Sequence, residues 1–163
     1  MSLHSGANGS VPSTIKLVGY DFVFVESLIP ECDALGAIRE LSPQARYMKS
    51  ATTPLHKHGH DTFCRFRIAI PSGLMGVYAL MKDGAVCYIG ECEDLGKRFN
   101  MGYGNISPKN CYQGGQPTNC KINHRVLEVS KAGGRIDLYF HQTSQRKAVE
   151  KLLIVRCSPP WNG

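Results

Sequence analysis

A tight β-hairpin is the feature that most limits how this chain can fold. Residues 76–90 read GVYALMKDGAVCYIG, with two runs of β-forming residues on either side of an Asp-Gly pair. An Asp-Gly pair in this setting is typical of a hairpin turn, because glycine readily adopts the positive φ that the turn requires. We therefore predict two antiparallel strands, one carrying Tyr78 and the other carrying Tyr88.

The length of the turn decides whether the two tyrosines can act together, because side chains alternate between the two faces of a strand. With a two-residue turn, Tyr78 lies opposite Ile89 and the tyrosines point to opposite faces. With a three-residue loop over residues 82–84, Tyr78 lies opposite Tyr88 and both hydroxyl groups lie on one face. The hairpin sequence by itself leaves both registers open.

Length and composition favour one packed domain. The chain has 163 residues, of which 42% are hydrophobic. No run approaches the roughly 18 consecutive apolar residues of a membrane-spanning helix, and the start has no apolar run of the signal-peptide type. The seven cysteines include no CxxC pair. We therefore expect reduced thiols and a cytoplasmic location.

The net charge of +6 is concentrated in the part of the chain that holds the hairpin. Residues 1–75 contain seven Lys and Arg against six Asp and Glu, whereas residues 76–163 contain twelve against seven. Such a basic excess favours a polyanionic partner such as nucleic acid.

The first part of the chain shows strand and helix patterns. We expect residues 1–14 to be a mobile leader and residues 15–27 to form a strand pair broken near Gly19. A helix is predicted over residues 30–42, where apolar side chains recur every three positions at Leu35, Ile38 and Leu41.

The segment before the hairpin alternates in polarity. Residues 44–49 favour a short helical turn, and residues 52–61, which include three histidines, favour a loop. Residues 63–70 read FCRFRIAI, with apolar and basic side chains on alternate positions. This pattern predicts an amphipathic strand of the same sheet as the hairpin.

After the hairpin, helices alternate with one strand. The predicted elements are a helix at 95–100, a long ordered loop at 101–119, a helix ending at Lys131, a strand at 135–141 and a helix between Thr143 and Ser158. The chain is thus predicted to have an α+β fold, with a small, mainly antiparallel sheet flanked by helices.

Five features in this order resemble the GIY-YIG nuclease family. They are GVY at 76–78, YIG at 88–90, Arg98 on the next helix, Glu150 on the last helix, and Asn162 near the end. The family's order of strand, strand, helix, helix, strand and helix is the order predicted above. The resemblance implies a GIY-YIG nuclease-like domain at 76–163, with residues 15–75 as an N-terminal α/β extension packed on the same body.

The resemblance implies a divalent-metal-dependent DNA endonuclease that hydrolyses phosphodiester bonds with Mg²⁺ or Mn²⁺. Glu150 would hold the metal, since Mg²⁺ needs few protein carboxylates. Arg98 would bind the scissile phosphate through its planar donors. Tyr78 would accept a proton from the attacking water, with Arg98 and the metal favouring its phenolate. Tyr88 would orient the water or bind phosphate, and Asn162 would contact phosphate or support the site.

One position departs from the family pattern. Some family members carry a histidine four residues after the arginine, and here that position is Gly102. The missing histidine favours a second hypothesis, a catalytically weak or inactive DNA-binding module with the same fold. A third hypothesis, an RNA-processing or protein-binding domain, has less support.

Basic and aromatic residues after the hairpin predict a DNA-contacting surface. The expected contact residues are Lys97, Tyr103, Lys109, Tyr112, Lys121 and Arg125. The alternative is a solvated loop with a structural role. The implied partner is double-stranded or branched DNA. One such site cuts one strand, so double-strand cleavage would require a homodimer or two sequential cuts.

Two groups of His and Cys residues are candidate zinc sites. The first is His56, His58, His60 and Cys64, and the second is Cys111, Cys120 and His124. Neither group has the paired spacing of structural zinc sites. Solvent-facing histidines and buried thiols are the favoured interpretation.

The implied function selects one of the two hairpin registers. If Tyr78 and Tyr88 share a site, they must lie on one face, which a three-residue loop at 82–84 provides. We therefore predict that loop, with Gly84 at positive φ.

Overall fold

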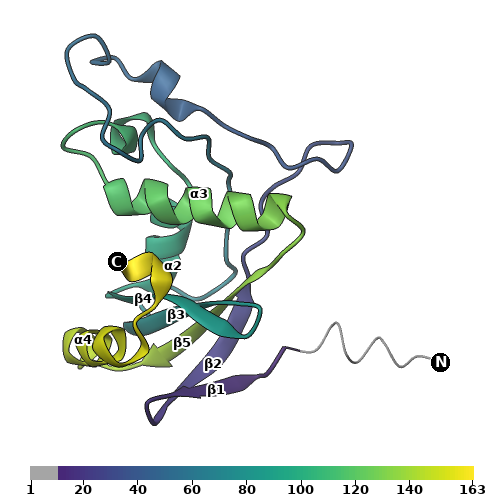
Figure 1. The fold of residues 1–163 in the computed structure, drawn as a ribbon, viewed down its shortest axis with the longest axis vertical. Helices are drawn as coiled ribbons and strands as arrows, with labels where there is room; N and C mark the ends of the chain where they lie inside the picture. The colour runs from purple at the N-terminus through teal and green to yellow at the C-terminus, as the bar shows by residue number, and fades with distance from the viewer. Residues whose placement is uncertain (1–10) are drawn as a thin grey trace.

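The computed structural model describes residues 11–163, which form an α+β fold around one five-stranded sheet (Figure 1). Every pair of neighbouring strands is antiparallel, in the order β1-β2-β5-β3-β4. The predicted fold class is confirmed. The strands are β1 Thr14–Leu17, β2 Tyr20–Ser27, β3 Gly76–Lys82, β4 Ala85–Cys92 and β5 Ile136–Gln142.

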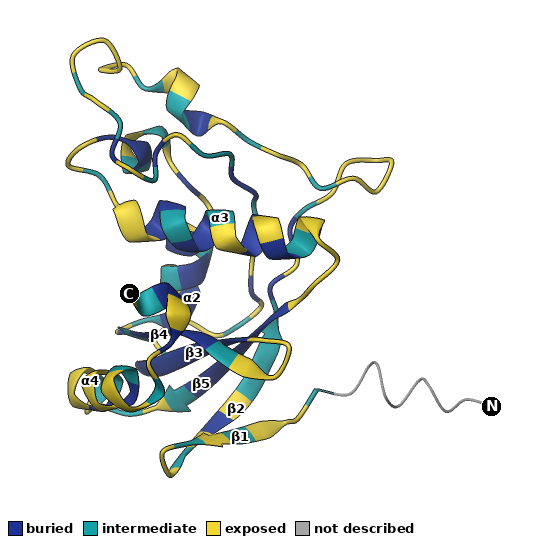
Figure 2. Ribbon diagram, in the orientation of Figure 1, coloured by how far each residue is buried: buried dark blue, intermediate teal, exposed yellow. Residues whose placement is uncertain are grey.

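Helices cover both faces of the sheet. Helix α3 (Pro117–Lys131) packs on the face that carries Tyr78, whereas α4 (Arg146–Cys157) packs on the face that carries Val77. Figure 2 shows β3 and β5 largely buried between these layers. The shorter elements are η1 Pro43–Arg46, α2 Leu95–Arg98, the π-helix η2 Phe99–Tyr103, η3 Pro108–Cys111 and η4 Pro160–Asn162.

The element order is the one that the GIY-YIG resemblance implies. From residue 76 onward it runs β3, β4, α2, α3, β5 and α4, with short η2, η3 and η4 turns between or after them. None of the described helices has both the length and the apolar character needed to cross a membrane.

The β3-β4 hairpin combines a two-residue turn with a β-bulge. Asp83 and Gly84 have φ angles of 52° and 80°, as in a type I′ turn, so positive φ at Gly84 is confirmed. The predicted three-residue loop is wrong, because Lys82 pairs directly with Ala85. Further along, Cys87 is an extra residue on β4, and its thiol donates a hydrogen bond to the Leu80 carbonyl at 3.2 Å.

The bulge places both tyrosines on the same face. Beyond it, Tyr78 pairs with Gly90 and Leu80 pairs with Tyr88. Positions 88 and 90 lie on one face of β4, because side chains alternate along a strand. The shared face of Tyr78 and Tyr88 is therefore confirmed, although the turn that was predicted to produce it is absent.

The first strands join the same sheet as the hairpin. The break predicted near Gly19 is present, since Val18 and Gly19 have φ angles of 50° and 85° between β1 and β2. Strand β2 then pairs with β5, so residues on both sides of position 75 build one sheet. Of the predicted leader, residues 1–10 lie outside the described residues.

Residues 30–42 do not form the predicted helix. The Asp33 carboxylate accepts hydrogen bonds from the N–H groups of Leu35 and Ala37 at 2.8 and 3.0 Å, and Gly36 has a φ of 87°. A side-chain turn of this kind competes with helical hydrogen bonding. Leu35 is 94% exposed, so the three-residue spacing of apolar residues did not mark a buried helix face.

Residues 63–70 have the predicted alternation of buried and exposed side chains, but they are not a strand of the sheet. Two asparagine side chains replace a neighbouring strand. The Asn123 amide accepts from the Cys64 N–H at 2.9 Å and donates to the Cys64 carbonyl at 2.8 Å. Asn100 makes the same pair of bonds with Ile68, at 2.7 and 3.0 Å. These amides satisfy the backbone of an extended segment outside any sheet.

Candidate active site

Tyr78 lies on the central strand β3, with its side chain 1% exposed. Its ring covers the backbone of Gly90 on the neighbouring strand. A Cβ atom at Gly90 would lie 2.3 Å from the Tyr78 hydroxyl oxygen, so no larger residue fits there without moving the ring. The glycine of the YIG motif is thus required by the position of the tyrosine of the GVY motif.

Tyr78, Arg98 and Tyr103 form one hydrogen-bonded group. The hydroxyl oxygens of Tyr78 and Tyr103 are 2.5 Å apart. The Arg98 guanidinium donates to Tyr103 at 3.0 Å through Nη2 and to Tyr78 at 3.4 Å through Nε. The carboxylate of Asp94 begins α2 by accepting the Lys97 N–H at 3.1 Å, and this helix presents Arg98 to the phenols.

The π-helix η2 brings Tyr103 into this group. The Gly104 N–H donates to the Phe99 carbonyl, five residues earlier, at 2.7 Å. One turn of a π-helix is longer than one turn of an α-helix, so residue 103 stacks above Arg98 in place of residue 102. The Arg98 guanidinium lies 4.7 Å from the centre of the Tyr103 ring. Gly102 is four positions after Arg98 in the sequence. Because of the π-helix, the phenol of Tyr103 lies beside Arg98 in place of Gly102.

Tyr88 completes an aromatic cluster around the hydroxyl groups. Its ring centre lies 6.3 Å from those of both Tyr78 and Tyr103. Burial raises the pKa of Tyr78, Tyr88 and Tyr103 above that of a free phenol, and the positive charge of Arg98 only partly offsets this rise. The three phenols are therefore protonated in the isolated chain at neutral pH.

Glu150 lies on α4, on the opposite face of the sheet from the phenols. Helix α4 packs against β4, the edge strand that carries Tyr88. Burial raises the pKa of the Glu150 carboxyl, the Glu91 carboxylate adds to the rise, and Arg98 opposes it. Arg146 contacts Glu91 and precedes Glu150 by one turn of α4, so Glu150 lies on the part of α4 that is near the end of β4.

Arg146 pairs with the two carboxylates that follow the YIG motif. Its guanidinium contacts Glu91 and also donates to Glu93 at 2.9 Å. Glu150 lies one helical turn after Arg146 on α4, but in the described residues the two side chains form no ion pair. Within residues 11–163 the Glu150 carboxylate takes part in no ion pair, which leaves it free for a cation.

A cleft of about 800 Å³ opens beside Arg98. Its walls come from the end of β4, from α2, from the start of α3 and from α4. The charged lining residues are Glu91, Glu93, Asp94, Lys97, Arg98, Arg146 and Lys147. Four cations and three carboxylates thus line one cleft.

Asn162 supports the site through the backbone of β4. Its side-chain oxygen accepts the Ile89 N–H at 2.9 Å, and its side-chain nitrogen donates to the Ile89 carbonyl at 2.8 Å. The amide thereby occupies the free edge of the strand that carries Tyr88 and Gly90. Of the two roles implied for Asn162, these contacts favour structural support over phosphate contact.

The six predicted DNA-contacting residues fall into three groups. Lys97 and Lys109 are exposed, whereas Tyr103 and Tyr112 are buried, at 0% and 6% exposure, and do not form part of the surface. The other two residues lie on α3 beside the chain end. Lys121 donates to the Trp161 carbonyl at 2.5 Å, and the Arg125 guanidinium lies 5.9 Å from the Trp161 ring centre.

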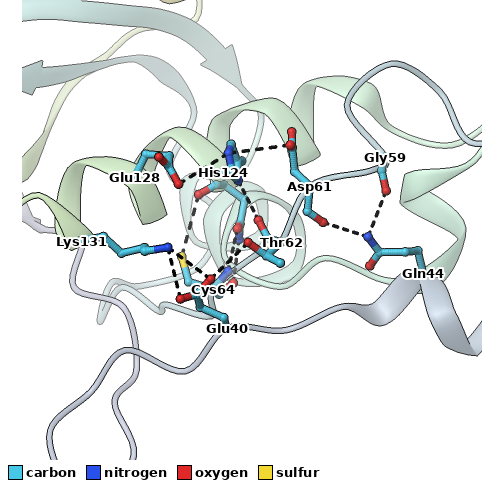
Figure 3. A network of polar contacts seen from close by, with 10 residues as sticks. Glu40, Gln44, Gly59, Asp61, Thr62, Cys64, His124, Glu128 and Lys131 are labelled. Atoms are coloured by element: carbon cyan, nitrogen blue, oxygen red, sulfur yellow. Dashed lines mark hydrogen bonds and ion pairs between the residues drawn. The ribbon is translucent and has the colours of Figure 1, made fainter.

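The His and Cys groups serve the packing of residues 52–64. Both ring nitrogens of His56 are occupied, one by the Asn110 carbonyl at 2.5 Å and one by the His58 N–H at 3.1 Å. His124 bonds the Thr62 carbonyl at 2.8 Å and lies near the carboxylates of Asp61 and Glu128 (Figure 3). Across the described part of the chain, no three His, Cys, Asp or Glu side chains meet in a metal-binding arrangement.

Comparison with known proteins gives a structural likeness only. No family model matches the chain, and no curated protein matches it. Among solved structures, a mutant of bacteriophage T4 EndoII is similar, with a TM-score of 0.49 and 20% sequence identity. The match covers 86% of this chain and 92% of that chain. The fold assignment above rests on the strand order and register of this chain.

Proposed function

We propose that this chain is a divalent-metal-dependent DNA endonuclease that hydrolyses phosphodiester bonds. The observation that carries the proposal is the hydrogen-bonded group of Tyr78, Tyr103 and Arg98, in which Arg98 lines the cleft, together with Glu150 on α4, the helix whose first residues also line the cleft. This combination supplies a cation for a phosphate, phenols that can exchange a proton, and a free carboxylate for a metal ion. The order of Tyr78, Arg98 and Glu150 along the chain resembles the GIY-YIG pattern.

Arg98 is proposed to bind the scissile phosphate. Two of its donor atoms are held by Tyr78 and Tyr103, which fixes the guanidinium plane at the side of the cleft. A guanidinium has five N–H donors, so donors remain for phosphate oxygens. Because Arg98 cannot lose its charge at neutral pH, it stabilises negative charge that develops on the phosphate.

Tyr78 and Tyr103 are proposed to act as a pair in proton transfer. If either phenol loses its proton, the resulting phenolate accepts hydrogen bonds from the other phenol and from Arg98. Charge-assisted bonds of this kind favour the ionised form, whereas burial opposes it. We propose that the pair accepts a proton from a water beside Arg98, the member of the group that lines the cleft, with the resulting charge shared across three groups.

The residues present fit a hard divalent cation such as Mg²⁺ or Mn²⁺. Glu150 is partly buried and free of ion pairs within residues 11–163, and Mg²⁺ is commonly held by one or two carboxylates together with water and phosphate oxygens. When bound, such an ion would stabilise negative charge on the phosphate and on the leaving oxygen. Arg146 neutralises Glu91 and Glu93, and Asp94 caps α2, so we assign the metal ion to Glu150.

A second function, DNA binding without turnover, is supported by one observation. Burial raises the pKa of all three phenols at the site, which disfavours the phenolate that a general base requires. If this effect prevails with DNA bound, the chain shifts DNA in a gel but cuts no substrate with magnesium or manganese.

Nicking of supercoiled plasmid tests the endonuclease proposal. Wild-type chain with magnesium is expected to nick the plasmid, and Glu150→Gln or excess chelator is expected to abolish nicking. The matched control is Glu93→Gln, which removes an exposed carboxylate from the same cleft and is expected to keep most of the activity. Undiminished nicking by Glu150→Gln would overturn the proposed metal site. In a separate experiment, competition between DNA and RNA for the chain would identify the preferred nucleic acid.

A further inference from the structure

A second pocket lies between η1 and η3 and shares a lining residue with the cleft. Figure 1 shows η1 and η3 on the far side of α3 from the sheet. Its volume is about 450 Å³. The residues that line it are Arg46, Tyr47, Met48, Lys49, Ser107, Pro108 and Lys109. Ser107 also lines the cleft, so the start of η3 is a wall shared by the two. A polymer that leaves the cleft across η3 enters this η1–η3 pocket.

The charge of the η1–η3 pocket is entirely positive. Arg46, Lys49 and Lys109 are exposed and line it, and no carboxylate does. In the described part of the chain, none of these three side chains takes part in an ion pair. Three uncompensated cations around a small pocket attract a polyanion with several closely spaced charges.

The same pocket presents apolar side chains. Met48 is 98% exposed, and Tyr47 beside it is partly buried, with its ring centre 4.5 Å from that of Tyr112. The Tyr112 hydroxyl donates to the Gln44 carbonyl at 2.8 Å, which ties η1 to η3. The walls are therefore held in place before any ligand binds. An aromatic ring and a flexible thioether between cations are suited to contact the flat face of a base.

We propose that the η1–η3 pocket binds an unpaired DNA segment that continues from the strand in the cleft. Phosphates would contact Arg46, Lys49 and Lys109, and one base would pack against Tyr47 and Met48. The bases of a duplex are paired and stacked, so only an unpaired strand presents a base face to this pocket. The inference rests on the proposed function only in placing the strand to be cut in the cleft, and it implies a preference for branched or single-strand-tailed DNA.

Equilibrium binding without metal tests the pocket independently of cleavage. The probes are a blunt labelled duplex and the same duplex with an unpaired arm, measured by fluorescence anisotropy over a range of salt concentrations in chelator. Wild-type chain is expected to bind the armed duplex about five- to hundredfold more tightly, since one stacked base contributes about 1–3 kcal/mol and about 1.4 kcal/mol is tenfold in affinity. The double variant Arg46→Ala, Lys49→Ala is expected to lose part of this preference, because two phosphate contacts are removed and the base contact remains.

The salt dependence separates the phosphate contacts from the base contact. For the armed duplex, the double variant is expected to lower the slope of log affinity against log salt by about 1.4, because each single-strand phosphate contact contributes about 0.7. Met48→Ala is expected to weaken binding of the armed duplex without changing this slope. The control Lys16→Ala, Lys82→Ala removes two cations from β1 and the hairpin, and is expected to keep the preference for the arm.

Equal affinity of the wild-type chain for armed and blunt duplexes would overturn the proposal, as would an unchanged slope in the Arg46, Lys49 double variant. Tighter binding of an unpaired RNA arm than of the DNA arm would overturn the assignment to DNA. An arm preference without cleavage on addition of magnesium would support the pocket and contradict the endonuclease. Cleavage without an arm preference would support the endonuclease and contradict the proposed role of the pocket.

Discussion

The hydroxyl oxygens of Tyr78 and Tyr103 lie 2.5 Å apart, although one residue is on β3 and the other is on η2. Arg98 donates a hydrogen bond to each of them. The family resemblance assigns proton transfer to Tyr78, whereas this geometry supports a role shared by two phenols and one guanidinium.

Replacing Tyr103 with Phe is expected to reduce both stability and nicking activity. The change removes a hydroxyl group that is 0% exposed and leaves the Tyr78 hydroxyl and one Arg98 donor without this partner. Removing one partner from a buried hydrogen bond costs about 1–3 kcal/mol. Thermal or denaturant unfolding measures the loss of stability, and plasmid nicking below the melting temperature measures the loss of activity.

Tyr112→Phe is the matched control for that change. Tyr112 is also buried, and its hydroxyl donates to the Gln44 carbonyl at 2.8 Å, outside the cleft. It is expected to lose a similar amount of stability and to keep its nicking rate on a plasmid without unpaired arms. Equal activity of the Tyr103 and Tyr112 variants would show that Tyr103 has only a structural role.

Gly90→Ala is expected to disrupt the site, because the new Cβ would lie 2.3 Å from the Tyr78 hydroxyl oxygen. Tyr78 is fully buried, and overpacking of this kind costs about 1–3 kcal/mol. The comparison is Gly102→Ala, whose Cβ would lie 3.6 Å from the nearest atom, an ordinary contact. Unfolding and nicking assays on both variants are expected to show a large loss for the first and a small one for the second. A fully active Gly90→Ala variant would contradict the described packing.

Asn162→Ala is expected to lower stability by about 1–2 kcal/mol, because two hydrogen bonds to the Ile89 backbone are lost. If Asn162 only supports β4, DNA affinity in the absence of metal should be nearly unchanged in this variant. Anisotropy binding curves provide the measurement. A large loss of affinity with little loss of stability would instead assign Asn162 to phosphate contact.

Alkaline pH is expected to destabilise the chain. Burial raises the pKa of Tyr78, Tyr88 and Tyr103 above the ordinary value of 10.0, so the folded state holds these protons more tightly than the unfolded state does. The resulting stabilisation is complete below about pH 10 and is lost as the pH rises through the folded-state pKa values. A titration of phenolate absorbance should show some of the seven tyrosines ionising only as the chain unfolds. Ionisation of all of them near pH 10, with the fold intact, would contradict this.

Local patterns predicted most of the sheet and the helices at the site. The Asp-Gly turn, the break near Gly19, the helix that ends at Lys131 and the last helix are all present. Each depends on residues close in sequence, which is why the sequence alone could predict it. The apolar spacing of residues 30–42 misled because Asp33 and Gly36 form a turn whose local hydrogen bonds outcompete a helix.

The rest of the candidate site depends on features that spacing does not reveal. The role of Tyr103 depends on a π-helix, because an α-helix would place Gly102 there. The side chains of Asn100 and Asn123 bond the backbone of residues 63–70, whose sequence resembles a strand. Nothing in that sequence indicates that side chains, and not a neighbouring strand, would bond its backbone. These arrangements follow from packing between elements that are distant in the chain.

The extra residue Cys87 compensates for the two-residue turn. Without this bulge, the same turn would place Tyr78 and Tyr88 on opposite faces of the hairpin. Tyr78 and Tyr88 are separated by nine residues, a spacing that suits a two-residue turn only when one residue is looped out of the ladder. A homologue could therefore gain or lose one residue between the two motifs and keep the same site, provided that the bulge appears or disappears with it. Evolutionary changes of length in this hairpin should come in such compensated pairs.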